Sequence, residues 1–190
     1  MTVDRGAVRE RVLAATIDCI GERGMGKLRV DDVARHAGVG RATLYRYFPG
    51  GREQLISEAI TWEVGRFFTA LAAAVADAPD LRRRLERGLM FAHQAMTEHS
   101  ALATVLDADR EQFLPLLHET SPLVMAVVRD YLAPALALEQ LQPGVDPDEA
   151  ADYLARMVLS FIPSPGQWDL TDPDQVAELV DRQFLAGILA

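Results

Sequence analysis

Cysteine is almost absent from this chain of 190 residues, which excludes a fold held together by internal disulfides. Cys19 is the single cysteine, a usage that fits a reducing compartment. Apolar runs approaching the ~20 residues of a membrane-spanning helix are also missing. The N-terminal residues lack the apolar core of a secretory signal. The sequence therefore predicts a soluble, cytoplasmic protein.

Alternating apolar patterns typical of strands are scarce, whereas apolar residues recur at helical spacing along most of the chain. This pattern predicts an all-α fold. Gly24 is expected to end the first helix, and Asp146 to cap another that has Pro147 as its first residue. Pro115, Pro122 and Pro134 are expected to break or kink the helix that holds them. Helices are expected near residues 4–23, 29–37, 40–48, 52–76, 80–98, 100–108, 110–137, 147–161 and 173–188.

Positive charge is scarce overall but concentrated near the N-terminus. The formal net charge is −9, from 28 acidic and 19 basic side chains. The first 52 residues hold ten basic and six acidic residues, a local charge of +4, which leaves −13 for the remainder. Such an asymmetry suggests a module that binds a polyanion, joined to an acidic body. Charge alone does not separate nucleic acid from an acidic protein as the partner.

The stretch from residue 33 to residue 48 has the spacing of a helix-turn-helix. Ala34 is small enough for two helices to pack closely, and Gly38 permits a left-handed turn between them. Val33, Leu44 and Phe48 supply apolar anchors, with Val39 beside them. Once these residues face inward, the remaining side chains face outward and suit a DNA duplex, since arginine reads guanine edges and hydroxyls bond phosphates.

The sequence "VDDVARHAGVGRATLYRYF", preceded by a helix ending in "GERG" and followed by "GREQL", closely resembles the TetR family of bacterial transcriptional repressors. The resemblance covers about the first 55 residues. It implies base contacts from Arg41, Ala42 and Tyr45, and phosphate contacts from Thr43, Tyr47 and Arg52. Arg46 fits either role, Gly40 gives up a polar contact that many relatives have, and Arg29 replaces a threonine with an electrostatic contact. The DNA-binding residues implied are therefore Arg29, Gly40, Arg41, Ala42, Thr43, Tyr45, Arg46, Tyr47 and Arg52.

One departure from the family pattern affects Arg52. The segment "FPGGREQL" is one residue longer than the usual Phe-x-x-Lys-Glu pattern, so matching Arg52 to the family lysine assumes a one-residue insertion. The alternative is that Arg52 is a solvated residue at a helix start.

The resemblance also implies two domains, a DNA-binding domain at residues 1–51 and a helical regulatory domain at residues 52–190. The regulatory domain is expected to dimerise and to bind a small hydrophobic effector. The dimer interface implied comprises Tyr153, Met157, Phe161, Val176, Val180, Phe184 and Ile188, although such apolar stripes also fit a monomer core. The candidate ligand pocket comprises Trp62, Phe67, Phe68, Met90, Phe91, His93, Met96, Phe113 and Met125, each of which also fits a helical core.

The chain offers little for catalysis. Its four histidines lack a His-x3-His spacing, and no carboxylate accompanies them in a ligand motif. We expect no metal, cofactor or catalytic residue. The leading hypothesis is a homodimeric repressor that binds a palindromic operator in double-stranded DNA and is released by a small hydrophobic ligand. The alternatives are a regulator with the same DNA-binding residues but controlled by a protein partner, and an all-helical enzyme.

Overall fold

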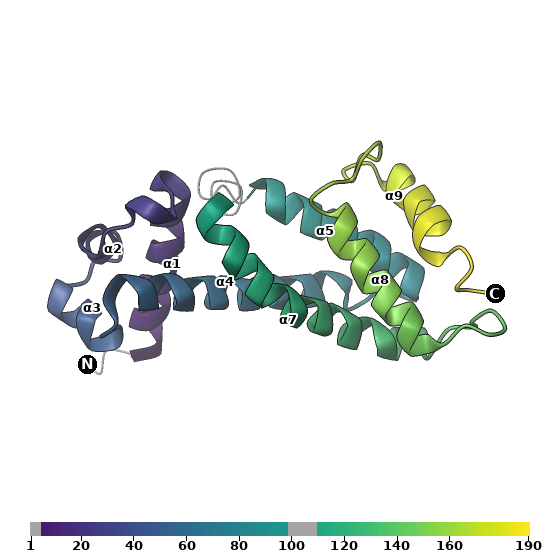
Figure 1. Ribbon diagram of the computed structural model, residues 1–190, viewed down its shortest axis with the longest axis horizontal. Coiled ribbons are helices and arrows are strands. Elements are labelled where there is room, and N and C mark those ends of the chain that lie inside the picture. The colour runs from purple at the N-terminus through teal and green to yellow at the C-terminus, as the bar shows by residue number, and fades with distance from the viewer. Residues whose placement is uncertain (1–4, 99–109) are drawn as a thin grey trace. The chain divides into compact units, whose positions relative to one another are not determined.

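The computed structural model describes residues 5–98 and 110–190, and helices account for its regular structure (Figure 1). Within those ranges there is no strand, only an isolated bridge between Leu141 and Leu189. The prediction of an all-α fold is confirmed. The helices are α1 (Arg5–Arg23), a 3-10 turn η1 (Met25–Lys27), α2 (Val30–His36), α3 (Arg41–Tyr47), α4 (Gly51–Val75), α5 (Leu81–Glu98), α7 (Arg110–Leu136), α8 (Pro147–Phe161) and α9 (Pro173–Leu179).

The chain forms two compact units, one of Met1–Thr69 with Thr97–Leu114 and the other of Ala70–Met96 with Pro115–Ala190. In the first unit, α1 packs against α2, and α2 against α3. We call α1, α2, α3 and the first turns of α4, as far as Ala59, the head. Val12 and Leu13 of α1 and Leu55 of α4 are each 0% exposed. Arg9 of α1 also pairs with Glu58 of α4 at 2.5 Å, so the start of α4 lies against α1.

Gly24 ends α1 as predicted. Its φ of 81° is open to glycine at little cost, and its amide donates to the Ile20 carbonyl over 2.8 Å. The chain then turns through η1 into α2. This turn places the carbonyl groups of Met25 and Leu28 beside the start of α4.

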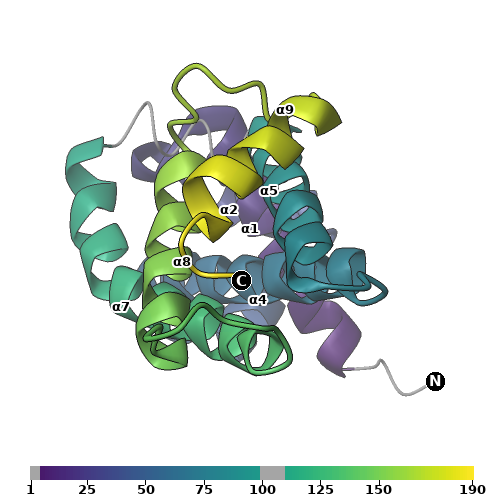
Figure 2. The ribbon, with the colours of Figure 1, turned by 90° about the vertical axis from the view of Figure 1, so that its right-hand side faces the viewer.

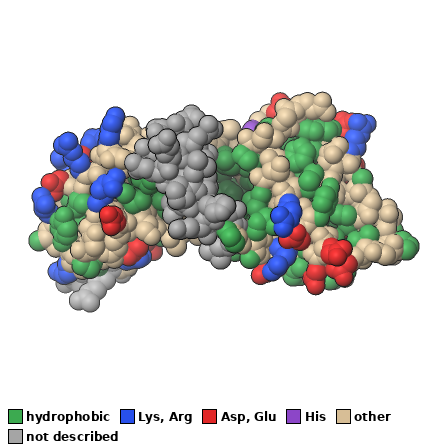
Figure 3. Space-filling model, viewed as in Figure 1, with side chains coloured by type: hydrophobic (Ala, Val, Ile, Leu, Met, Phe, Trp, Pro, Cys, Tyr) green, Lys and Arg blue, Asp and Glu red, His purple; other side chains and the backbone are tan. Residues whose placement is uncertain are grey.

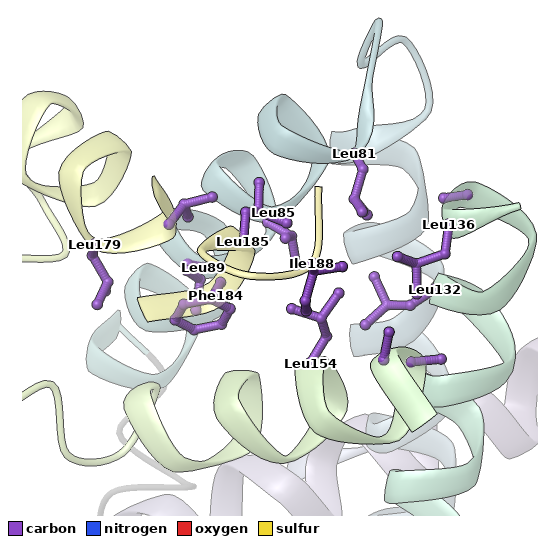
Figure 4. Close-up of a cluster of buried hydrophobic side chains, with 14 of the residues drawn as sticks. Leu81, Leu85, Leu89, Leu132, Leu136, Leu154, Leu179, Phe184, Leu185 and Ile188 are labelled. Carbon is purple, nitrogen blue, oxygen red and sulfur yellow. The ribbon is translucent and has the colours of Figure 1, made fainter. Parts of the chain in front are cut away.

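The second unit has a core of hydrophobic side chains, mostly leucine, from α5, α7, α8 and the C-terminal segment (Figure 4). Leu89, Leu136 and Leu154, from three different helices, are each 1% exposed or less. α9 and the turn after it lie over α5 and α8 and close this core (Figure 2). The apolar residues that recur at helical spacing on each of these helices therefore pack together in one core.

Two details differ from the sequence expectation, and a third falls outside the part of the chain that the structure describes. The last helix, expected over residues 173–188, ends at Leu179 and continues as a wider π-type turn over Val180–Leu185. α7 is continuous through Pro122 and Pro134, which do not break it. The helix expected near residues 100–108 lies outside the described residues.

Two helix starts show capping geometry. Asp146 accepts hydrogen bonds from the amides of Asp148 and Glu149 at 2.9 and 3.1 Å, with Pro147 as the first residue of α8, as predicted. Asp172 caps α9 in the same way. In the described ranges, no helix is both long and apolar enough to span a membrane.

Candidate nucleic-acid interface

The elbow between α2 and α3 is built as the sequence predicts. Leu44, Phe48 and Val33 are 0% exposed, and Ala34 is 5% exposed. Gly38 has a φ of 63°, a left-handed value that favours glycine, and the next amide, of Val39, donates to the Ala34 carbonyl over 2.9 Å. These contacts fix the direction in which α3 leaves the turn.

Burial of Leu44 fixes which side of α3 faces away from the core. Arg41, Ala42, Tyr45 and Arg46 are exposed. Thr43 and Tyr47 are half-buried, and Gly40 lies at the N-cap in extended backbone without a side-chain cap. The predicted base and phosphate contacts on α3 therefore lie on its outer surface, with hydroxyls and guanidinium groups on one short helix. Lys and Arg side chains are visible on the surface of the first unit in Figure 3.

Arg41, the predicted guanine reader, already has partners within the chain. Its Nη1 lies 3.0 Å from the Asp31 carboxylate of α2, and its guanidinium lies 5.5 Å from the Tyr45 ring centroid. Both members of the ion pair are more than half exposed, so solvent screens it and its contribution to stability is small. The pair holds the guanidinium at the start of α3 without burying it.

Arg52 is engaged by the backbone of the head. Its Nε donates to the Leu28 carbonyl over 3.1 Å, and its Nη2 donates to the Met25 carbonyl over 2.6 Å. Two of its three nitrogens thus donate to carbonyls at the end of η1, and a phosphate contact through Arg52 stays a prediction. Arg52 is more than a solvated side chain at a helix start, because it ties α4 to the segment before α2.

The extra glycine before Arg52 stands at the turn into α4. Gly51 begins α4 with a φ of 64°, and its amide donates to the Phe48 carbonyl over 3.0 Å. A side chain at this left-handed position would be strained. The Gly50 amide donates to the Gln54 side chain over 2.7 Å and so satisfies one donor at the helix start.

Arg29 lies at the N-cap of α2, in extended backbone with no side-chain cap, as expected from the loss of a threonine there. Its side chain is exposed. Asp31 and Asp32 occupy the first turn, where carboxylates interact favourably with the helix dipole.

A concavity of about 430 Å³ lies beside α3 and was not predicted. Its polar wall comprises Thr43, Arg46 and Tyr47 of α3 together with Arg11 of α1. The turn residues Gly38, Val39 and Gly40 also line it. Arg11 stands 30 residues before the start of α3, so no local motif could have associated it with the predicted interface.

The candidate pocket residues are divided between the two units. Trp62, Phe67 and Phe68 belong to the first unit, where the two phenylalanine rings pack edge to face at 5.4 Å. Met90, Phe91, His93, Met96 and Met125 belong to the second. All eight are half-buried, which leaves each with some accessible surface. Phe113 lies outside the residues whose side chains are described.

The candidate dimer residues separate into two groups. Val176, Val180 and Phe184 are 0% exposed and Ile188 is 7% exposed within the single chain. These four belong to the core of the second unit, which corrects their assignment to a dimer interface, because they have almost no surface left for a partner. Tyr153 is 41% exposed, and Met157 and Phe161 are half-buried, so α8 keeps apolar surface.

Comparisons with known proteins agree with this arrangement. A family model described as "Bacterial regulatory proteins, tetR family" matches residues 12–59, from α1 into the first turns of α4. An uncharacterized HTH-type transcriptional regulator of Mycobacterium tuberculosis, Rv0196, is 28% identical over 193 residues, covering 96% of this chain and 94% of that protein. HTH-type transcriptional regulator AqdR of Rhodococcus erythropolis is 48% identical over 58 residues, 30% of this chain and 28% of that protein. The solved structure of a TetR-like transcriptional regulator from Rhodococcus sp. RHA1 is 21% identical with a TM-score of 0.61, covering 97% of this chain and 99% of that one, and is similar in fold.

Proposed function

Because this chain belongs to the TetR family of bacterial regulatory proteins and is a DNA-binding transcriptional regulator, we propose that it is a homodimeric repressor of a palindromic operator. Residues 1–51 serve as the DNA-binding domain, and residues 52–190 dimerise and receive an effector. The α3 helix of each subunit enters a major groove. Half-sites are then separated by about 34–36 Å or a multiple of that spacing. The protein would work in the cytoplasm, where the DNA is.

The observation that carries the proposal is the division of α3 into a buried and an outer side. Leu44 is completely buried and holds the helix against the core, whereas Arg41 and Tyr45, about one turn apart, remain exposed. A guanidinium group can donate two hydrogen bonds to a guanine edge, and the Thr43 and Tyr47 hydroxyls can bond the phosphate backbone. The elbow holds these groups on a rigid element rather than on a mobile loop.

Dimerisation through α8 fits the surface that remains. Tyr153 keeps its ring exposed while its hydroxyl donates to the Gln183 carbonyl over 2.6 Å. Met157 and Phe161 follow on the same helix at intervals of four residues, so the three side chains form one stripe. A matching stripe from a second copy would cover it, and two-fold symmetry would match the symmetry of a palindrome.

Release from DNA requires an effector that binds the free protein better than the DNA-bound protein. The half-buried side chains of Met90, Phe91 and Met96 on α5 favour a hydrophobic effector. A coupling free energy of about 1–3 kcal/mol would weaken operator binding about 5- to 150-fold.

The test is selection of operator sequences from random duplexes, followed by titration of the selected duplex at several salt concentrations. Wild-type protein should enrich a palindrome and bind it as a dimer, which sedimentation of the complex measures. Arg41→Ala should relax the preference at one base pair of each half-site, whereas Thr43→Val and Tyr47→Phe should weaken binding to all sequences alike. Enrichment of no sequence, together with a monomer at all concentrations, would refute the proposal.

A further inference from the structure

The concavity beside α3 joins two elements that are far apart in the sequence. Val8 and Arg11 line it from α1, three residues apart and therefore on one face of that helix. Thr43, Arg46 and Tyr47 line it from α3. Two guanidinium groups and two hydroxyls thus surround a single hollow next to the outer side of the helix proposed to read DNA.

The arginines in this concavity differ in their ion pairing from Arg9, Arg23 and Arg41 of the same unit. Arg9 pairs with Glu58 at 2.5 Å, Arg23 with Asp32 at 2.6 Å, and Arg41 with Asp31 at 3.0 Å. For Arg11 and Arg46, by contrast, no carboxylate of the part of the chain that the structure describes lies within ion-pairing distance. The Arg46 guanidinium lies over the Tyr47 ring at 5.5 Å, which leaves its charge uncompensated.

Two cations without a paired carboxylate in one concavity favour an anion there. Guanidinium groups bind the oxygens of a phosphate through paired hydrogen bonds, and hydroxyl groups add further donors. Arg11 and Arg46 are both exposed, so an anion can reach them from outside the molecule. Among anions, a phosphate of the DNA backbone is the one that would lie here when α3 occupies the groove.

We propose that this concavity receives a backbone phosphate of the operator and that Arg11 is a DNA contact supplied by α1. The inference rests on the proposed function. Contacts to one phosphate from both α1 and α3 fix the angle of α3 in the groove, because the two helices then grip the same point on the backbone. Such a contact adds affinity for any sequence and carries no base preference.

The experiment compares Arg11→Gln with Arg9→Gln on the selected operator. Arg9 lies two residues away on α1, about 200° around the helix, and removal of its charge changes the net charge by the same amount. Loss of one phosphate contact should reduce the slope of log affinity against log salt by about 0.9 in Arg11→Gln. The affinity deficit of that variant should then be about 3.5-fold larger at 50 mM than at 200 mM salt. Arg9→Gln should keep the wild-type slope, and Arg11→Lys should restore it.

A scan with single methylphosphonates, which remove the charge of one phosphate at a time, identifies the partner. In each half-site, neutralising one particular phosphate should lower the affinity of wild type and of Arg9→Gln. Neutralising the same phosphate should not lower the affinity of Arg11→Gln further, because that variant already lacks the contact. Equal slopes and equal scans for the two glutamine variants would overturn the Arg11 contact while leaving the repressor proposal intact. If wild type binds no duplex in a salt-dependent way, the repressor proposal itself fails. Thermal melting of each variant confirms that the head is folded.

Discussion

Replacement of Arg52 separates its observed contacts from the phosphate contact that its place in the sequence suggests. Arg52→Met keeps an unbranched aliphatic stem but removes every hydrogen-bond donor. Arg52→Lys keeps the charge, yet its single nitrogen cannot reach the carbonyls of Met25 and Leu28 as the forked guanidinium does. If Arg52 ties α4 to the Met25 and Leu28 carbonyls, which we call the tether, both variants should be less stable than wild type. If Arg52 contacts a phosphate, the lysine variant should keep that contact.

The size of the effect follows from the two hydrogen bonds at 3.1 and 2.6 Å. A hydrogen bond to a charged group contributes about 1.5–3 kcal/mol to stability, and the lower value suits a half-buried side chain. Arg52→Met should then lose about 3 kcal/mol and Arg52→Lys about half of that. For a chain of this size, each kcal/mol corresponds to about 2–4 °C in Tm. The expected falls in Tm are about 6–12 °C for methionine and about 3–6 °C for lysine.

Thermal melting by far-UV circular dichroism measures the stability of each variant, and operator titration against salt measures its phosphate contacts. Arg46→Met is the control with the opposite expectation, since Arg46 is exposed and has no hydrogen bond to the backbone of the head. Its Tm should equal that of wild type, and its affinity for DNA should be lower. The tether is refuted if both Arg52→Lys and Arg52→Met have the Tm of wild type, and if Arg52→Met lowers the slope of log affinity against log salt by about 0.9.

Three further predictions concern the helix caps and the cysteine. Asp146→Ala should destabilise the second unit by about 1 kcal/mol in urea unfolding, through loss of the cap of α8; an unchanged midpoint would contradict this. Hydrogen bonds from the Gln175 side chain and the Asp174 amide lower the pKa of Asp172, so its carboxylate stabilises the fold above its unfolded pKa and loses this effect as pH falls through the lowered value. The Tm difference between wild type and Asp172→Asn should accordingly shrink below about pH 4, and a constant difference at more acidic pH would count against the cap. Burial raises the pKa of the Cys19 thiol, so a thiol reagent at neutral pH should label the native protein far more slowly than the urea-unfolded protein, and equal rates would show that Cys19 is accessible.

The elbow could be predicted from the sequence because burial there follows from local spacing. Ala34, Gly38 and Leu44 each have a requirement that acts within one turn of helix: small size, a left-handed φ and an apolar anchor. These positions also determine which side of α3 faces outward. The sequence therefore predicted the architecture of the head and the candidate reading residues together.

The element that covers an apolar helix face could not be predicted in the same way. The apolar stripe of Val176, Val180 and Phe184 indicates that one side of a helix is covered, but a monomer core and a second copy cover it equally well. In the structure, α5 and α8 of the same chain cover it. The position of Arg11 beside α3 and the contacts of Arg52 with two carbonyls could not be predicted for a related reason. The turns between helices, rather than sequence spacing, bring their neighbours close.

The ion pair between Asp31 and Arg41 bears on how many operators one such protein can serve. A side chain that contacts a base discriminates strongly against a wrong base pair when the mismatch leaves its own charged group without a partner. In the proposed complex, Arg41 can return to Asp31 when the base pair offers no guanine, so a mismatch costs less there than at a position without an internal acceptor. Operators with substitutions at that base pair would remain usable, and the set of genes under control could grow or shrink by single mutations in DNA. Asp31, which need not touch DNA at all, would thus affect how strictly that one base pair is read.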